Sequence, residues 1–297
     1  MDPILILDHV NKSFGGLSVT CDVSVSVMPG DITAIIGPNG AGKTTLFNQI
    51  TGHLIPDSGR IIFQGDDITG MPPQNIVNRG MGRAFQITSI FPEETVLENV
   101  RVACLSHRNE ILRPFRHVGS FKRATDRAYE ILDSLGLTNQ ADRPAFELAH
   151  GDQKLLDIGI ALGLEPKLLL LDEPTSGMSP EERQLTRDLI KKLWKEFNLT
   201  LVFIEHDMDT VFGIAQLVRV LTLGRLLAEG PPDEIRNNPE VITAYLGEEV
   251  SRATISKPKT SIPSMAEAIS LSMSVSPSGL VRRSALWAGM GRAKQQP

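Results

Sequence analysis

The hydrophobic pattern divides the chain into a strand-rich beginning, a helix-rich middle and an alternating end. Short β-prone runs separated by Gly, Asp and Pro occupy the beginning: ILILDHV (4–10), VSVSV (23–27), DITAIIG (31–37) and RIIFQG (60–65). Two later runs, KLLLLD (167–172) and LTLVFIEH (199–206), are apolar almost without interruption. Such runs are typical of strands that are buried on both faces of a parallel sheet.

Helical periodicity fills most of the chain between these runs. KTTLFNQITG (43–52) predicts a helix that ends at Gly52, and residues 94–165 are mostly helical in pattern with no convincing strand. PEERQLTRDLIKKLWKEF (180–197) is amphipathic at helical spacing. LVRVLTLGRLLAEG (217–230) predicts a hairpin that turns at Gly224.

We therefore predict an α/β fold in which a core of parallel strands and helices is interrupted by a helical insertion. The compact domain is expected to occupy residues 1–249, with a helical subdomain at about 88–165. The tail, residues 250–297, is rich in Ser and Pro with few large apolar residues, and we expect it to be disordered. Two of its pieces, SMAEAISLSM and LVRRSALWAGM, are able to form short helices on a partner or on an anionic membrane surface.

Composition places the chain among soluble globular proteins, with 41% hydrophobic and 22% charged residues. No apolar run reaches the roughly 18 residues needed to span a bilayer. The start, MDPILILDHV, lacks the basic region of a signal peptide. Cys21 and Cys104 have no CxxC spacing, which argues against a disulfide framework and fits a reducing cytosol.

The formal net charge of −5 conceals a division along the chain. The tail carries seven basic residues and one acidic residue, Glu267, and this charge of +6 leaves −11 for residues 1–249. A domain with that charge is not expected to bind nucleic acid.

The first motif that indicates a chemistry is GPNGAGKT, residues 37–44, which fits the phosphate-loop pattern G-x-x-x-x-G-K-[ST]. It follows a predicted strand and opens a predicted helix, where consecutive backbone N–H groups surround a β-phosphate. We expect Lys43 to reach the β- and γ-phosphates and the Thr44 hydroxyl to ligate Mg²⁺. The predicted nucleotide contacts in this loop are Gly37, Pro38, Asn39, Gly40, Ala41, Gly42, Lys43, Thr44 and Thr45.

The second motif is LLLLDEP, residues 168–174, in which two carboxylates end an apolar strand. Asp172 is expected to hold Mg²⁺ through its water shell, because Mg²⁺ gives up water reluctantly. Glu173 is expected to orient or deprotonate the attacking water.

Residues 4–247, which contain both motifs, resemble the ATP-binding subunits of ABC transporters. The resemblance implies a P-loop NTPase of ABC type, with a RecA-like parallel-sheet core, an antiparallel β subdomain and a helical insertion, which binds Mg²⁺ and hydrolyses ATP. It also implies roles for single residues. Phe14 in NKSFGG would stack on adenine, Gln86 in GRAFQ would sense Mg²⁺ and the γ-phosphate, and His206 in FIEHD would contact the γ-phosphate. SGMSP, residues 176–180, would cross a dimer interface.

Three segments make the resemblance more specific within the family: FQITSIFPEETVLENVRVA, the long insertion before AYEILDSLGL, and IEHDM. These look like the ATPases of bacterial importers for branched-chain amino acids, and urea and short-amide importers share them. The implied partners are a second ATPase subunit (the same chain or a paralogue), integral membrane permease subunits and, indirectly, a periplasmic solute-binding protein. The implied location is the inner face of the cell membrane.

The segment LAHGDQ, residues 148–153, stands where the family has Leu-Ser-Gly-Gly-Gln, which caps the γ-phosphate bound by the opposite subunit. The expected nucleotide contacts here are Ala149, His150 and Gly151, since the backbone amides survive a change of side chain. Asp152 departs from the family pattern, and we interpret it as an acidic residue that favours the helix dipole and points away from the phosphates.

Ser179 is a second departure, because the family usually has Asp at this place. Together the two departures raise the hypothesis that the chain hydrolyses ATP slowly as a homodimer and works best beside a non-identical subunit. Two alternatives stay open: a soluble ATPase of this fold that acts on other proteins, and a module that holds ATP without cleaving it. A P-loop kinase is disfavoured, because LAHGDQ and His206 would have no role in it.

Overall fold

The computed structural model describes residues 2–84, 90–107 and 118–245. The chain divides into two compact units, Met1–Pro232 and Asp233–Pro297. The proposed tail, 250–297, and its two candidate helices lie outside the described residues, so the domain boundary at 249 stays a prediction.

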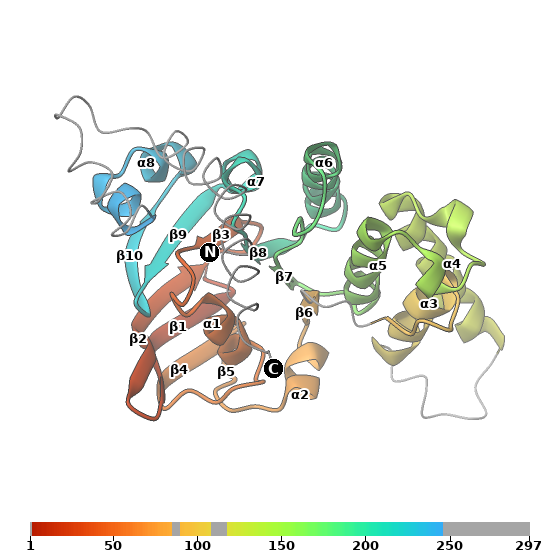
Figure 1. Cartoon of the computed structure of the whole chain (residues 1–297). Coiled ribbons are helices and arrows are strands. Elements are labelled where there is room, and N and C mark those ends of the chain that lie inside the picture. The colour runs from red at the N-terminus through yellow and green to blue at the C-terminus, as the bar shows by residue number, and fades with distance from the viewer. Residues whose placement is uncertain (1, 85–89, 108–117, 246–297) are drawn as a thin grey trace, which may run out of the picture. The chain divides into compact units, whose positions relative to one another are not determined.

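A six-stranded sheet forms the centre of the first unit (Figure 1). Its order is β10-β9-β3-β8-β7-β6, and all neighbours are parallel except the β9–β10 hairpin. The uninterrupted apolar runs became the central strands, in which every residue is buried, as the pattern predicted. The strands are β3 (Ile32–Ile36), β6 (Met81–Ala84), β7 (Leu168–Asp172), β8 (Thr200–Ile204), β9 (Leu217–Thr222) and β10 (Arg225–Gly230).

A four-stranded antiparallel sheet of order β2-β1-β4-β5 lies beside this core (Figure 1). Helix α1 (Lys43–Ile50) joins the two sheets in one hydrophobic cluster, in which Phe47 is fully buried. The strands are β1 (Leu5–Phe14), β2 (Leu17–Val27), β4 (Ser58–Phe63) and β5 (Asp66–Asp67).

Three helices, α3 (Val96–His107), α4 (Val118–Leu135) and α5 (His150–Gly163), pack on one another as the predicted helical insertion (Figure 1). Close packing requires small residues on α5, because a Cβ at Gly163 would lie 2.9 Å from the Cβ of Ala103. The α/β class, with a parallel core, an antiparallel sheet and a helical insertion, is confirmed.

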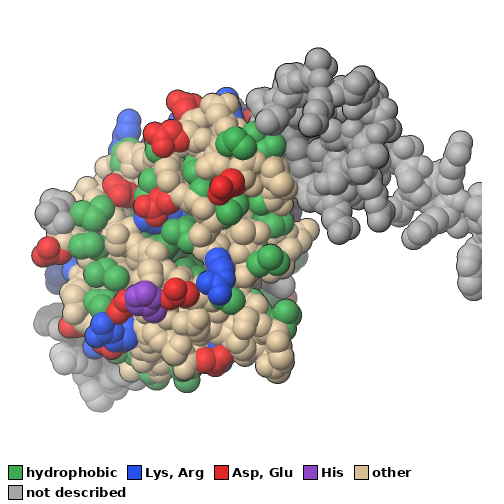
Figure 2. Space-filling view, turned by 90° about the vertical axis from the view of Figure 1, so that its left-hand side faces the viewer, with side chains coloured by type: hydrophobic (Ala, Val, Ile, Leu, Met, Phe, Trp, Pro, Cys, Tyr) green, Lys and Arg blue, Asp and Glu red, His purple; other side chains and the backbone are tan. Residues whose placement is uncertain are grey.

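The remaining labelled elements are α2 (Pro73–Asn78), α6 (Pro180–Glu196), α7 (Met208–Ile214) and α8 (Pro232–Arg236), with short 3-10 turns at Thr138–Gln140 and Ala145–Glu147. Residues 239–245, at the end of the described part of the chain, are also helical. Within the described part of the chain, no helix combines the length and apolar character that crossing a bilayer requires. On the face that Figure 2 presents, hydrophobic side chains are scattered among charged and polar ones and form no single broad patch.

The sequence pattern missed β6, which became the edge strand beside β7. Only Met81 and Ala84 of its four residues are apolar, so its periodicity was too weak to indicate a strand. The strand matters because it carries Arg83 to the site described next.

Candidate active site

The phosphate loop, residues 37–44, connects the end of β3 to the start of α1. Gly42 is the N-cap of α1 with a left-handed φ of 98°. A Cβ at Gly42 would lie 2.4 Å from a backbone oxygen of β2, and one at Gly37 would lie 2.1 Å from a backbone oxygen of β9. Both positions therefore require glycine. Thr44 in the first turn of α1 is exposed, which leaves its hydroxyl open to a ligand.

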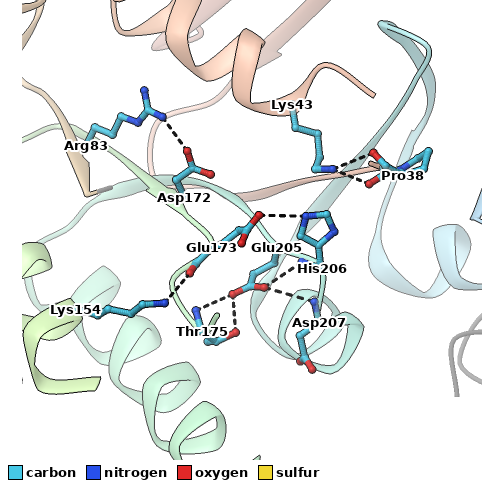
Figure 3. A network of polar contacts seen from close by, with 11 residues as sticks. Pro38, Lys43, Arg83, Lys154, Asp172, Glu173, Thr175, Glu205, His206 and Asp207 are labelled. Atoms are coloured by element: carbon cyan, nitrogen blue, oxygen red, sulfur yellow. Dashed lines mark hydrogen bonds and ion pairs between the residues drawn. The ribbon is translucent and has the colours of Figure 1, made fainter. Parts of the chain in front are cut away.

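Lys43 turns its ammonium group back onto the phosphate loop (Figure 3). Its Nζ donates to the carbonyl oxygens of Gly37 at 2.7 Å and Pro38 at 3.1 Å. Burial lowers the pKa of Lys43, and the nearby carboxylates of Glu173 and Asp172 oppose that shift. A lysine charge that bonds only to neutral carbonyls is well placed to exchange them for phosphate oxygens.

Asp172 ends β7 and is almost completely buried. Its Oδ2 accepts from the Arg83 guanidinium at 2.8 Å, and the same guanidinium donates to Asn48 of α1 and lies over the Phe47 ring. Its other oxygen, Oδ1, is buried and has no hydrogen-bond partner among the described residues. A buried carboxylate oxygen without a partner fits the hydrated Mg²⁺ expected here.

Glu173 follows Asp172 with an unusual backbone, because its φ of 53° is left-handed. Such a conformation in a non-glycine residue costs about 1–3 kcal/mol and persists only when its surroundings hold it. Here the N–H of Glu173 donates to the carbonyl of Ile204 at 2.9 Å, and the Lys154 ammonium donates to the carbonyl of Glu173. The side chain then points at His206, whose Nε2 lies 3.2 Å from Oε1 of Glu173 (Figure 3).

Glu205 is a buried carboxylate that joins the loops after β7 and β8 (Figure 3). It accepts from the N–H of Thr175 at 2.8 Å and from its hydroxyl at 2.5 Å, and it also accepts from the N–H of His206 at 3.0 Å. One side chain therefore fixes the loop of Glu173 relative to the backbone of His206.

The LAHGDQ segment opens α5, with Ala149 as an N-cap whose side chain makes no capping bond. Asp152 lies in the first helical turn, and its carboxylate accepts from the Gln140 side chain at 3.0 Å. The side chain is thus held by a partner of the helical subdomain, and its orientation away from the phosphates stays a prediction. The exposed His150 lies close to Gly177 in the loop after β7.

Ser179 is the N-cap of α6 and makes a complete capping box with Glu182. Its hydroxyl accepts from the N–H of Glu182 at 3.3 Å, and its own N–H donates to the Glu182 carboxylate at 2.7 Å. The serine that departs from the family pattern therefore has a structural role in beginning this helix.

The structure gathers Lys43, Asp172, Glu173 and His206 in one place, as Figure 3 shows. Phe14 ends β1 with half of its side chain exposed, and the Lys12 ammonium lies 5.8 Å from the centre of its ring. Gln86 lies outside the described residues.

Sequence reasoning missed the residues that hold the site together: Arg83, Lys154, Thr175 and Glu205. Each stands within three residues of a predicted site residue or of a predicted strand end, and this was the only signal available. Their partners come from segments 19–89 residues away, so no local pattern indicates the pairing.

A phosphate loop between strand and helix, a carboxylate pair at the end of a second parallel strand and a histidine after a third define a P-loop ATPase of the ABC type. Residues 20–176 match the family described as ABC transporter, and residues 225–251 match the one described as branched-chain amino acid ATP-binding cassette transporter. The chain belongs to the ABC transporter ATP-binding family, and it is an ATP-hydrolysing subunit that powers an importer.

Relatives and solved structures agree with this assignment. The chain is 41% identical to the high-affinity branched-chain amino acid transport ATP-binding protein LivG of Escherichia coli, over 83% of this chain and 98% of that protein. It is 40% identical to the corresponding protein BraF of Pseudomonas aeruginosa, over 83% and 98%. An ATP-binding cassette of an ABC transporter solved in its ADP conformation has a TM-score of 0.72 at 33% identity, covering 83% of this chain and 100% of that one.

Proposed function

We propose that this chain hydrolyses Mg²⁺-ATP to power an importer for branched-chain amino acids. The observation that carries the proposed chemistry is the meeting of Lys43, Asp172, Glu173 and His206 at the carboxyl ends of three parallel strands. The proposed solute class rests on the relatives, whose names give branched-chain amino acid transport.

The nucleotide would bind along the phosphate loop. Backbone N–H groups of residues 37–45 and the ammonium of Lys43 would receive the phosphates, with adenine stacked on the half-exposed ring of Phe14. The hydroxyl of Thr44 and the unpartnered oxygen of Asp172 would hold the magnesium ion, with Gln86 assigned to it from sequence alone. When bound, the ion would neutralise part of the negative charge of the phosphates.

The hydrolytic step follows from the pair of Glu173 and His206. The Glu173 carboxylate would accept a hydrogen bond from the attacking water and so orient it toward the γ-phosphate. His206 and Lys43 would stabilise the negative charge that develops on the transferred phosphoryl group. Glu173 and His206 already lie side by side without substrate, which lowers the reorganisation needed in the transition state, whereas Lys43 must first exchange its carbonyl partners for phosphate oxygens.

A second ATPase subunit would complete the site. The amides at Ala149–Gly151 begin a 14-residue helix, and the positive end of its dipole suits the γ-phosphate of a partner's nucleotide. Asp152 would leave that approach open, since its carboxylate accepts a hydrogen bond from Gln140. Ser179 would take part in the same interface through the 176–180 loop. We keep the hypothesis that the chain hydrolyses ATP slowly as a homodimer and works best beside a paralogue.

Permease subunits would dock on the exposed aromatic surface formed by the loops of Phe91 and Phe146, and the chain would then lie at the inner face of the cell membrane. Phe91 is 55% exposed and Phe146 is 53% exposed. Their loops adjoin, since the N–H of Phe146 donates to the carbonyl of Pro92. Two neighbouring exposed phenylalanines favour a protein contact over solvent.

The proposed chemistry is tested by phosphate release from the purified chain beside Glu173→Gln, with size-exclusion chromatography in Mg²⁺-ATP. We expect the wild type to release phosphate, and the variant to accumulate an ATP-bound dimer instead. A wild-type chain that binds ATP without releasing phosphate, alone and with its paralogue and permease, would support the alternative of an ATP-holding module.

The solute is tested by uptake into cells of the source organism that lack this chain, complemented with the wild type or with Glu173→Gln. Loss of leucine uptake that only the wild type restores would support the proposal. Loss of urea or short-amide uptake instead would favour that neighbouring class. No change in any uptake, with the chain absent from the membrane fraction, would favour a soluble ABC ATPase.

A further inference from the structure

Lys154 is a buried lysine of α5 that reaches the loop after β7. Its Nζ donates to the carbonyl oxygens of Glu173 and Ser176 (Figure 3 shows the contact with Glu173). Burial lowers the pKa of Lys154, while the carboxylates of Glu205 and Glu173 act in the opposite direction. Burying an ammonium group is costly unless it is hydrogen-bonded, so these two backbone carbonyls are the partners that justify a lysine here.

Helix α5 also approaches the loop after β7 at His150, one turn nearer the N-terminus of the helix than Lys154. The His150 ring lies 3.8 Å from the place of a Cβ on Gly177. Residues 150 and 154 lie on one face of a helix, since positions four apart are neighbours. The face of α5 that carries His150 of the LAHGDQ segment therefore also carries Lys154 and its contact to Glu173.

The carbonyl of Glu173 is one of the two backbone groups that hold this residue in its left-handed conformation. Its N–H donates to Ile204 at the end of β8, whereas its carbonyl accepts from the N–H of Ser176 at 3.2 Å and from the Lys154 ammonium of α5 at 3.4 Å. A shift of α5 would therefore act on the carbonyl side of Glu173, while its N–H is bonded to a strand of the central sheet.

We propose that Lys154 is a positioning residue, which holds the backbone of Glu173 so that its carboxylate faces His206 and the attacking water. The inference rests on the proposed function. When α5 closes on the nucleotide of a second subunit, Lys154 passes the movement of the helix to the Glu173 of its own site. Hydrolysis at one nucleotide is thereby made dependent on closure at the other.

The test compares Lys154→Met, which keeps the apolar stem and removes the donor, with Lys154→Arg, which restores a charged donor. Lys192→Met is the matched control, because Lys192 also donates to a backbone carbonyl, that of Ser134, away from the site. We expect Lys154→Met to lower kcat by about 10- to 100-fold, as misplacement of a reacting group does. Its affinity for ATP should stay within about twofold, and Lys154→Arg should recover part of the rate.

A second readout needs no turnover. The imidazole NMR signals of His206, assigned with His206→Gln, report the neighbouring Glu173 carboxylate. We expect them to move in Lys154→Met, to return toward the wild type in Lys154→Arg and to stay in place in Lys192→Met.

The results separate this inference from the function on which it rests. Unchanged kcat and unchanged His206 signals in Lys154→Met would overturn the inference and leave the ATPase proposal standing. A parallel loss of kcat, ATP affinity and thermal stability would show general packing and would also overturn it. If the wild type does not hydrolyse ATP, the proposed function fails, and the His206 signals still decide whether Lys154 places Glu173.

Discussion

Nε2 of His206 lies 3.2 Å from Oε1 of Glu173. The two residues meet because they follow adjacent parallel strands, β7 and β8, in which Asp172 is paired with Ile204. Glu205 fixes the relation further by accepting from Thr175 on one loop and from the N–H of His206 on the other. Two side chains held so closely are expected to act as one unit in hydrolysis.

That unit is tested by a double-mutant cycle of Glu173→Gln and His206→Gln. Each single change should lower kcat by about 10²-fold or more, because orientation of the water and stabilisation of charge both depend on the pair. The double variant should be little worse than Glu173→Gln alone, since residues that act together are not additive. Phosphate release at saturating ATP measures the three rates, and losses that multiply would show that the two residues act independently.

Asp172→Asn tests the proposed magnesium ligand. Calorimetric titration of the wild type with ATP should show tighter binding when Mg²⁺ is present, because the Asp172 carboxylate receives the ion. The variant should bind ATP about equally with and without Mg²⁺ and should lose most of its hydrolysis, while its amide still accepts from Arg83. Asp67→Asn on the exposed strand β5 is the control. If Mg²⁺ still strengthens ATP binding to Asp172→Asn, the ion is held elsewhere.

The sequence predicted the residues that we propose to contact the nucleotide, but it did not predict the residues that hold them in place. Lys43, Asp172 and His206 sit beside strong local signals: a glycine-rich turn, an apolar strand and a second apolar strand. Their meeting follows from the rule that parallel strands present their carboxyl ends at one edge. The left-handed backbone of Glu173 and its support by Lys154 depend on contacts between distant segments, which a linear pattern does not record.

The strands also differ in whether the local sequence pattern predicts them. The all-buried strands β3, β7 and β8 were predictable, because burial on both faces requires uninterrupted apolar residues. The edge strand β6 was not, since MGRA owes its conformation to pairing with β7 and not to its own propensity. Arg83 lies in this strand, so its position beside Asp172 was not predicted either.

Asp207→Ala tests a pH dependence at the start of α7. Burial opposes ionisation of Asp207, but hydrogen bonds from Thr210 and the charge of Arg183 prevail and hold its pKa below the usual 3.8. A folded-state pKa below the unfolded one gives stability that is present above the unfolded pKa and is lost as the pH falls through the folded pKa. The variant should be less stable by about 1–2 kcal/mol at pH 7, as loss of an N-cap implies.

Urea unfolding over a pH series measures this difference. The gap between the wild type and Asp207→Ala should stay constant down to about pH 5 and narrow only below about pH 4. Asp209→Ala, which removes an exposed carboxylate from the same helical turn, is the control for charge alone. A gap that closes between pH 7 and pH 5 would contradict the assignment to Asp207.

Variants of Ser179 can separate a role in folding from a role in catalysis, because Ser179 is the N-cap of α6 and also one of the two positions at which the sequence departs from the family pattern. Ser179→Ala should lower the free energy of unfolding by about 1 kcal/mol, since the hydroxyl that accepts from Glu182 is lost. Ser179→Asp should keep that stability, because aspartate caps a helix as well as serine does.

If the missing carboxylate is what slows the homodimer, Ser179→Asp should also raise phosphate release by the chain alone. Denaturant unfolding and phosphate release on the same preparations measure both effects. If Ser179→Asp is as stable as the wild type but releases phosphate no faster, the missing carboxylate is not the cause of slow hydrolysis by the homodimer.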